Sequence, residues 1–180
     1  VFHSVASDFD GDGDEDVVSV GYHGLSVWEH KASEQFERVS QVDVNEKWGV
    51  YRNTALLDMN NDGHKDLVLA GDSGISVAEA EGNTSFGELL QWNEHVVTEF
   101  HAADFNNDGW GDLAVVDNNR GAFLFINDTN KGFEKIELEL PNKLHWDPFS
   151  NEVIPADPFK LKAIDLNEDG NLELIIQEFY

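Results

Sequence analysis

Short apolar runs, many of them alternating between apolar and polar residues, follow one another along the chain with glycine, asparagine or aspartate between them. Examples are HSVAS at 3–7, DVVSVG at 16–21 and GLSVWEH at 24–30. Runs of this length that are rich in valine, isoleucine and aromatic residues favour β-strands over helices. No window longer than about two helical turns shows helical periodicity. The pattern therefore predicts an all-β fold.

The runs belong to a repeat of about fifty residues. An acidic stretch with the pattern D-x-D/N-x-D-G-x-x-D/E comes after the first run of each unit and begins at Asp8, Asp58, Asp104 and Asp165. A glycine that opens a later run keeps its distance from this stretch in three units, at Gly24, Gly74 and Gly121. A phenylalanine opens the run after that, at Phe36, Phe86 and Phe133. Each unit is predicted to read strand, acidic loop, strand, turn, strand, turn, strand.

A four-stranded unit of this size is typical of a β-propeller blade. The runs directly after the acidic stretches are apolar on both faces, as expected for strands that are covered by a blade on either side. The alternative is an antiparallel sandwich with coincidental acidic turns. The common spacing of the acidic stretches and of the two later markers favours the propeller.

The repeats are expected at roughly 1–45, 50–95, 96–140 and 158–180, within a single domain that spans 1–180. The last unit stops after its second strand, so about three and a half blades are predicted. Because a propeller must close to protect its strand edges, we expect a part of a larger ring. Other blades of a longer chain, or a partner chain, would complete it. The segment PNKLHWDPFSNEVIPADPF, 141–159, holds all four prolines and is expected to form an elongated loop between blades.

The acidic stretches place oxygen ligands at alternate positions and follow them with a glycine that permits a sharp turn. A hard cation needs such a segment, and calcium takes about six to eight oxygens with tolerant geometry. We predict up to four bound Ca²⁺ ions, each held by side chains from four positions of one stretch and by one backbone carbonyl. The predicted side-chain ligands are Asp8, Asp10, Asp12, Asp16, Asp58, Asn60, Asp62, Asp66, Asp104, Asn106, Asp108, Asp112, Asp165, Asn167, Asp169 and Glu173. The predicted carbonyl ligands are those of Asp14, His64, Trp110 and Asn171.

Two other interpretations of these stretches are weaker. An EF-hand loop needs a glutamate at its twelfth position, where this chain has Ser19, Leu69, Val115 and Ile176. Here the last acid falls at the ninth position, directly before a strand, so the loop closes across a β-hairpin. A metal-free turn would explain one acidic stretch. It does not explain four, because the repulsion among their carboxylates would be unrelieved.

The acidic pattern between two strands, repeated about every 45 to 60 residues, resembles the FG-GAP/VCBS repeats of integrin α-chain-type β-propellers over nearly the whole chain. The resemblance implies a propeller, usually seven-bladed, with calcium in hairpin loops on one face and partner binding elsewhere. The chain departs from the family pattern in two ways. It has only four acidic loops, whereas the ring of the family is usually larger, and Glu173 replaces the last aspartate of the fourth loop. The family includes adhesion receptors, lectins and non-catalytic parts of polysaccharide-active enzymes, so the resemblance implies no single function.

Composition and charge narrow the function further. The chain carries 36 acidic against 11 basic residues, a formal charge of −25, which disfavours nucleic acid and anionic membranes as partners. No apolar run is long enough to span a bilayer. Cysteine is absent, and the nucleophile-elbow, P-loop and dinucleotide-binding patterns are not found. We therefore expect that the chain is not an enzyme, does not insert into a membrane and does not bind nucleic acid.

The expected function is a calcium-binding propeller module for adhesion to, or binding of, an extracellular protein or a glycan, with calcium in a structural role. The alternative is a non-catalytic propeller part of a carbohydrate-active enzyme, or a lectin. Weak calcium sites would be empty in the cytosol, so the expected location is extracellular, cell-surface or periplasmic. Side chains that could stack on sugars or protein groups are Trp48, Trp92, Trp146, Tyr51, His95 and His145. The favoured interpretation is that they anchor loops against the core.

Overall fold

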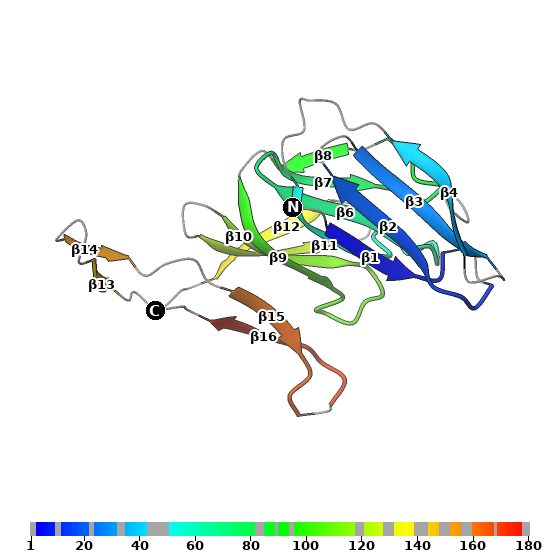
Figure 1. Ribbon diagram of the computed structural model, residues 1–180. Coiled ribbons are helices and arrows are strands. Elements are labelled where there is room, and N and C mark those ends of the chain that lie inside the picture. Colours follow the sequence, from blue (N-terminus) through cyan, green and yellow to red (C-terminus); the bar gives the residue numbers. More distant parts are fainter. Residues whose placement is uncertain are drawn as a thin grey trace.

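The computed structural model shows an all-β chain (Figure 1). It describes residues 3–9, 12–21, 24–31, 35–42, 51–81, 85–88, 90–93, 96–117, 121–127, 132–138, 144–147, 152–155, 160–167 and 169–177. The regular elements within these ranges are all strands. Most of them pair as antiparallel neighbours in chain order, which brings the acidic loops to the connections between first and second strands.

Three four-stranded antiparallel sheets form blades. The first contains β1 (His3–Ser7), β2 (Asp16–Gly21), β3 (Gly24–Lys31) and β4 (Gln35–Val42). The second contains β5 (Tyr51–Leu57), β6 (Asp66–Gly71), β7 (Gly74–Ala78) and β8 (Leu90–Asn93). The third contains β9 (Val97–Ala103), β10 (Asp112–Asp117), β11 (Ala122–Asn127) and β12 (Phe133–Leu138). A two-stranded sheet consists of β15 (Lys160–Ile164) and β16 (Glu173–Gln177).

The sheets stand side by side through their first strands (Figure 1). Strand β1 contacts β5, β5 contacts β9, and β9 contacts β15. A row of four-stranded sheets that meet along their first strands is the arrangement of propeller blades around an axis. The sheets are open, as in part of a propeller. The predicted fold class, an all-β partial propeller, is confirmed.

The hydrophobic core lies between adjacent blades. Leu25 and Leu67 belong to a cluster that joins the first two blades, and Val68 and Leu113 belong to one that joins the second and third. A smaller cluster forms around Val116, beside β15 and β16. Every residue of β6 and β10 is buried, because a neighbouring sheet covers each face. Burial alternates along β2, so the expectation of strands covered on both faces holds for the inner blades only.

Phenylalanines from the repeat connect one blade with the one before it. Phe86 is buried, and its ring meets that of Phe9 edge-on at a centroid distance of 5.8 Å. The prediction that Phe86 opens the last strand of its blade is wrong, since β8 begins only at Leu90 and Phe86 makes a single bridge to Ala80. Its side chain is held in the core between the blades, and we attribute the loss of strand pairing at Phe86 to this packing. Phe36, at the same place in the first blade, is 50% exposed.

The expectation of a loop at 141–159 needs correction. This segment contains β13 (Leu144–Asp147) and β14 (Glu152–Pro155), which pair as an antiparallel hairpin with Trp146 opposite Val153. The hairpin lies apart from the blades in Figure 1. Valine, isoleucine and tryptophan favour strands, and the prolines of this region fall at or beyond the strand ends, where no ladder hydrogen bond is lost.

Candidate functional site

Four acidic loops connect the first two strands of the sheets. The first loop is 8–16, the second 58–66, the third 104–112 and the fourth 165–173, and positions are counted from the first aspartate of each. The loops that follow β1, β9 and β15 lie on the lower side of the molecule in Figure 1. Each loop follows the first strand of its sheet, and these first strands are neighbours.

The same hydrogen bonds between backbone N–H groups and acidic side chains hold each loop. In the second loop, the N–H of Gly63 donates to Asp58 Oδ2 and that of His64 donates to Asp62 Oδ1, each at 2.8 Å. The bond from the sixth residue to the first aspartate recurs in the first, third and fourth loops at 3.1, 2.9 and 2.8 Å. Gly63 has a φ of 89°, a left-handed conformation that favours glycine. The acidic residues therefore help to fold the turn themselves.

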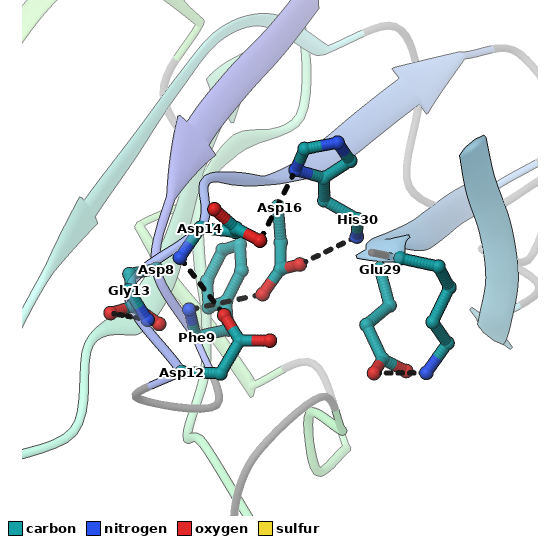
Figure 2. Close-up of polar contacts among 9 residues, drawn as sticks. Asp8, Phe9, Asp12, Gly13, Asp14, Asp16, Glu29 and His30 are labelled. Atoms are coloured by element: carbon teal, nitrogen blue, oxygen red, sulfur yellow. Dashed lines mark hydrogen bonds and ion pairs between the residues drawn. The ribbon is translucent and has the colours of Figure 1, made fainter. Parts of the chain in front are cut away.

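Figure 2 shows the first loop, in which Asp16 points its carboxylate at two backbone N–H groups. The N–H of Phe9 donates to one oxygen at 3.1 Å, and that of His30 donates to the other at 2.9 Å. The imidazole Nδ1 of His30 also lies 3.8 Å from a carboxylate oxygen of Asp14. Asp10 lies outside the described residues, so the structure places four of the five residues predicted as ligands in this loop.

The ninth position carries a buried carboxylate in three loops, and these side chains, Asp16, Asp66 and Asp112, are called the clamp carboxylates here. They are 0% to 1% exposed. Asp66 accepts the N–H of Met59 and the N–H of Ala80, both at 2.8 Å. Asp112 accepts two N–H groups in the same way, at 2.8 Å each. Each clamp carboxylate thus ties the start of its loop to the third strand of the blade or to the residues directly after it.

The sequence pattern assigns the ninth position to metal binding alone and does not reveal the clamp. The sequence does carry a signal for this second role of the ninth position. The third position varies between Asp and Asn, whereas the ninth is acidic in all four loops. An asparagine has only one acceptor oxygen and cannot receive two N–H groups through two oxygens. In the fourth loop, Glu173 accepts the N–H of Leu166 at 2.7 Å, but its second oxygen takes the amide of Asn167 at 3.3 Å.

Neighbouring loops also touch one another across the blade boundaries. Lys65 Nζ of the second loop donates to the serine hydroxyl directly before the first loop, at 2.9 Å. The N–H of Gly111 in the third loop donates to the carbonyl of Asp58 in the second, at 3.0 Å. Asn107 Nδ2 of the third loop donates to the carbonyl of Gly170 in the fourth, at 3.3 Å. The four loops therefore form a continuous row along one side of the blades.

The model of the FG-GAP-like repeat family matches residues 8–69 and 104–176, which together are more than half of the chain. The chain belongs to the FG-GAP-like repeat family. Both matched ranges begin at the first aspartate of an acidic loop, and the loops are called FG-GAP loops from here on. The predicted resemblance is confirmed. No curated protein matches the chain in sequence.

Two solved structures share the fold of this FG-GAP-like chain. One is a lectin of Agrocybe aegerita described as recognising non-reducing terminal N-acetylglucosamine, with a TM-score of 0.62 and 17% identity over 97% of this chain and 46% of the lectin chain. The other is the Photorhabdus luminescens Tc holotoxin pore, with a TM-score of 0.58 and 21% identity over 96% of this chain and 8% of that one. This chain therefore spans less than half the length of either, and the likeness shows the fold.

Negative charge is concentrated in the FG-GAP loops and is partly buried. Burial raises the pKa of Asp66 and of Asp112, while the N–H groups that donate to them act in the opposite direction. The carboxylates of Asp62 and Asp58 raise the pKa of Asp66 further. At the exposed end of the row, the N–H of Asn171 lowers the pKa of Asp169. Two of the clamp carboxylates, Asp66 and Asp112, therefore feel the repulsion of the other acids in their loops.

The donor set of the FG-GAP loops consists of carboxylate, amide and carbonyl oxygens, which suits a hard cation such as calcium. In the described part of the chain, no three Asp, Glu, His or Cys side chains meet in a preformed metal cluster. Loop N–H groups bind the carboxylates of the first and fifth positions instead. A carboxylate oxygen has a second lone pair, so these bonds leave acceptor capacity for a cation. The chemistry of the residues fits calcium, and the described side chains at the first, third and fifth positions are the candidates, because each is partly or fully exposed.

Two recesses lie beside the FG-GAP loops. One, of about 110 Å³, is lined by Asp8, His64, Lys65 and Phe86 between the first two blades. The other, of about 150 Å³, lies between the second and third blades and is lined by apolar and polar side chains, namely Met59, Asn60, Val77, Glu79, Leu90, Asn127 and Phe133. The second has the mixed lining that small-ligand sites use.

The side chains predicted as stacking candidates are only partly placed. Tyr51 is 5% exposed and belongs to the core between the first two blades, which agrees with the favoured anchoring interpretation. The side chains of Trp48, Trp92, Trp146, His95 and His145 lie outside the described part.

None of the described residues forms a helix that is long and apolar enough to cross a membrane.

Proposed function

We propose that this chain is a non-enzymatic, calcium-stabilised propeller module that binds an extracellular protein or a glycan. The observation that carries the proposal is the row of FG-GAP loops. All four share an oxygen-only donor set at alternate positions, and three of them place a buried carboxylate beneath it. Without a cation, the acids of each loop repel one another at short range.

Calcium suits these loops better than magnesium does, because it accepts more oxygen ligands and less regular geometry. Its role would be structural, since the loops join strands within a blade and contact the next loop. For a dissociation constant of roughly 0.1 to 1 mM, about 2 mM calcium adds roughly 0.6 to 1.8 kcal/mol per site. Up to four ions would occupy the row at extracellular calcium, and this supports an extracellular, cell-surface or periplasmic location.

Trp110 provides a direct test, because it occupies the seventh position of the third loop and its ring can sensitise terbium luminescence. Terbium is a calcium substitute, so energy transfer requires an ion bound near this loop. We expect sensitised emission that excess calcium displaces, together with a melting temperature that rises with calcium and not with magnesium. The Trp110→Phe variant should lose much of the emission but keep the calcium-dependent rise. Absence of both signals in the wild-type chain would reject calcium binding.

A glycan is the partner that the observations favour over other small ligands. The fold is shared with a lectin, and the recess between the second and third blades offers Phe133 and Leu90 beside the polar groups of Asn60 and Glu79. An aromatic face combined with amide and carboxylate groups is suited to a sugar ring. The alternative role, as a non-catalytic part of a carbohydrate-active enzyme, would use the same recess.

Glycan binding can be tested with an array that includes terminal N-acetylglucosamine, probed with calcium and with chelator. The Glu79→Ala variant should weaken any signal, since Glu79 lines the recess. The Glu134→Ala variant is the matched control, because Glu134 is exposed on β12 and does not line it. An array without signal in calcium would reject the glycan and leave an extracellular protein as the partner.

A further inference from the structure

The fourth position of the second and third loops is an asparagine with an unusual backbone conformation. Asn61 has a φ of 56° and Asn107 a φ of 58°. Asparagine tolerates this left-handed region better than most residues do. Each side chain meets the next loop in the row, Asn61 at Gly109 and Asn107 at Gly170 and Asn171.

Between the third and fourth loops this geometry produces a hydrogen-bonded bridge. Asn107 Nδ2 donates to the carbonyl of Gly170 at 3.3 Å and to the side-chain oxygen of Asn171 at 2.7 Å. Asn171 then donates to Asp169 Oδ1 twice, through its side-chain Nδ2 and its backbone N–H, each at 2.8 Å. A chain of hydrogen bonds therefore runs from the middle of the third loop to an acidic side chain of the fourth.

The other end of the bridge is equally well connected. Asn107 stands between Asn106 and Asp108, two residues with candidate ligand oxygens in the third loop. The N–H of Asp108 donates to Asp104 Oδ1 at 3.1 Å and to Asn106 Oδ1 at 3.0 Å. Any rearrangement of these acceptors around an ion would displace the backbone of Asn107, and with it the bridge to the fourth loop.

We propose that Asn107 is a positioning residue that couples the third and fourth loops, so that an ion bound in either one strengthens binding in the other. The inference rests on the proposed calcium binding and adds that the ion sites of the third and fourth loops are not independent. Coupling between two sites is reciprocal, because both ligands act on one shared equilibrium. The shared element is the bridge from Asn107 to Gly170 and Asn171.

The contact between the second and third loops lacks this relay and serves as the internal comparison. The amide of Asn61 lies against Gly109, 3.4 Å from the point where a Cβ of that glycine would be. The residue after Gly109 is Trp110, whose side chain has no acceptor oxygen for the amide. Asn61 therefore cannot reach Asp108 in the way that Asn107 reaches Asp169.

Each loop contains its own reporter for a site-resolved titration. The sixth-position glycines, Gly13, Gly63, Gly109 and Gly170, each donate the backbone N–H to the first aspartate of their loop. Their amide signals in ¹H–¹⁵N spectra of the full 180-residue chain should shift as calcium is added. Four midpoints are thus obtained from one titration, without reference to any binding partner.

The test compares Asn107→Gly with Asn61→Gly, because glycine removes the side chain and still permits the positive φ. In the Asn107→Gly variant, the midpoints of Gly109 and Gly170 should rise about two- to tenfold, as expected for the loss of one or two exposed hydrogen bonds. The midpoint of Gly63 should stay unchanged. In the Asn61→Gly variant, the midpoint of Gly170 should stay at the wild-type value.

A double-mutant cycle separates coupling from local damage. The Asp108→Asn variant weakens the third loop and should also raise the midpoint of Gly170, but it should add nothing once Asn107 has been replaced. If Asn107→Gly fails to fold, Asn171→Ala breaks the same bridge from the fourth loop and should raise the midpoint of Gly109. A wild-type midpoint for Gly170 in Asn107→Gly would overturn the coupling while leaving calcium binding in place. Glycine signals that ignore calcium in the wild-type chain would overturn both proposals.

Discussion

Replacing Asp66 by asparagine should destabilise the fold even when calcium is absent. The carboxylate is fully buried and accepts one backbone N–H on each oxygen, from Met59 and from Ala80. Asparagine keeps one acceptor oxygen, but its NH₂ group faces an N–H donor at the other end. The substitution therefore removes a charge-assisted hydrogen bond and leaves a buried donor without a partner.

The size of the effect follows from these two changes. A hydrogen bond to a charged acceptor contributes about 1.5 to 3 kcal/mol, and a buried unsatisfied donor costs about 1 to 3 kcal/mol, although the two overlap. Removal of a buried charge offsets part of the loss, since burial raises the pKa of Asp66. We expect the free energy of unfolding to fall by about 2 to 4 kcal/mol, a large share of the total for a typical domain of about 5 to 15 kcal/mol.

Urea unfolding followed by tryptophan fluorescence, in chelator and in about 2 mM calcium, measures this effect. The matched control is Asp62→Asn, because Asp62 is exposed in the same loop and has no clamp role. In chelator the control should change stability by less than about 0.5 kcal/mol, as surface substitutions usually do. In calcium it should reduce the gain from the ion. If the loss from Asp66→Asn disappears in chelator, Asp66 acts only as a ligand and the clamp is refuted.

Three further outcomes follow from packing and titration. In urea melts, Phe86→Ala should lower the free energy of unfolding by about 3 to 5 kcal/mol, because the ring of Phe86 is buried. The equivalent Phe36→Ala should lower it by less than about 1 kcal/mol, because Phe36 is 50% exposed. Equal losses in the two variants would contradict the inter-blade role of Phe86. Gly111→Ala should lower the free energy of unfolding by about 1 to 3 kcal/mol, since the added Cβ would lie 2.5 Å from a leucine of the preceding blade. At Gly87 the close atom is the end of a flexible glutamate, so Gly87→Ala is the control. The melting temperatures of the two variants check this. Burial lowers the pKa of His101, so the unfolded chain binds the proton more tightly and stability falls as the pH drops through about 6.5. The His101→Gln variant should therefore lose less stability between about pH 7 and pH 5 than the wild type, and parallel pH profiles would contradict this.

The sequence predicts the blades because its signals are local and repeated. The acidic stretches, the opening glycines and the doubly apolar runs keep a common spacing, and each corresponds to a connection or strand of the structure. The phenylalanine signal is correct as a repeat and wrong as a strand start at Phe86, because burial between blades determines its conformation. At 141–159, the prolines obscure a hairpin whose valine, isoleucine and tryptophan residues favour strands.

The clamp and the bridge were harder to predict, for different physical reasons. A carboxylate at the ninth position satisfies both a metal ligand and a double acceptor, so the residue type alone does not separate the two roles. The bridge depends on how one blade is rotated against the next, which local patterns do not specify. The Asn-Asn-Asp-Gly sequence around Asn107 does indicate a left-handed turn, but not the partner that its side chain meets.

The position of the acidic loops at the blade boundaries links proposed ion binding to the association of blades. Each loop contributes a contact to its neighbour, as Gly111 does to Asp58 and Asn107 does to Gly170. In a repeat protein, stability is approximately the sum of unit terms and nearest-neighbour terms. An ion that relieves repulsion within a loop therefore also strengthens the boundary that the loop forms. Calcium should then stabilise the row of blades by more than the sum of four isolated loops would give, and the excess should be largest between the third and fourth loops.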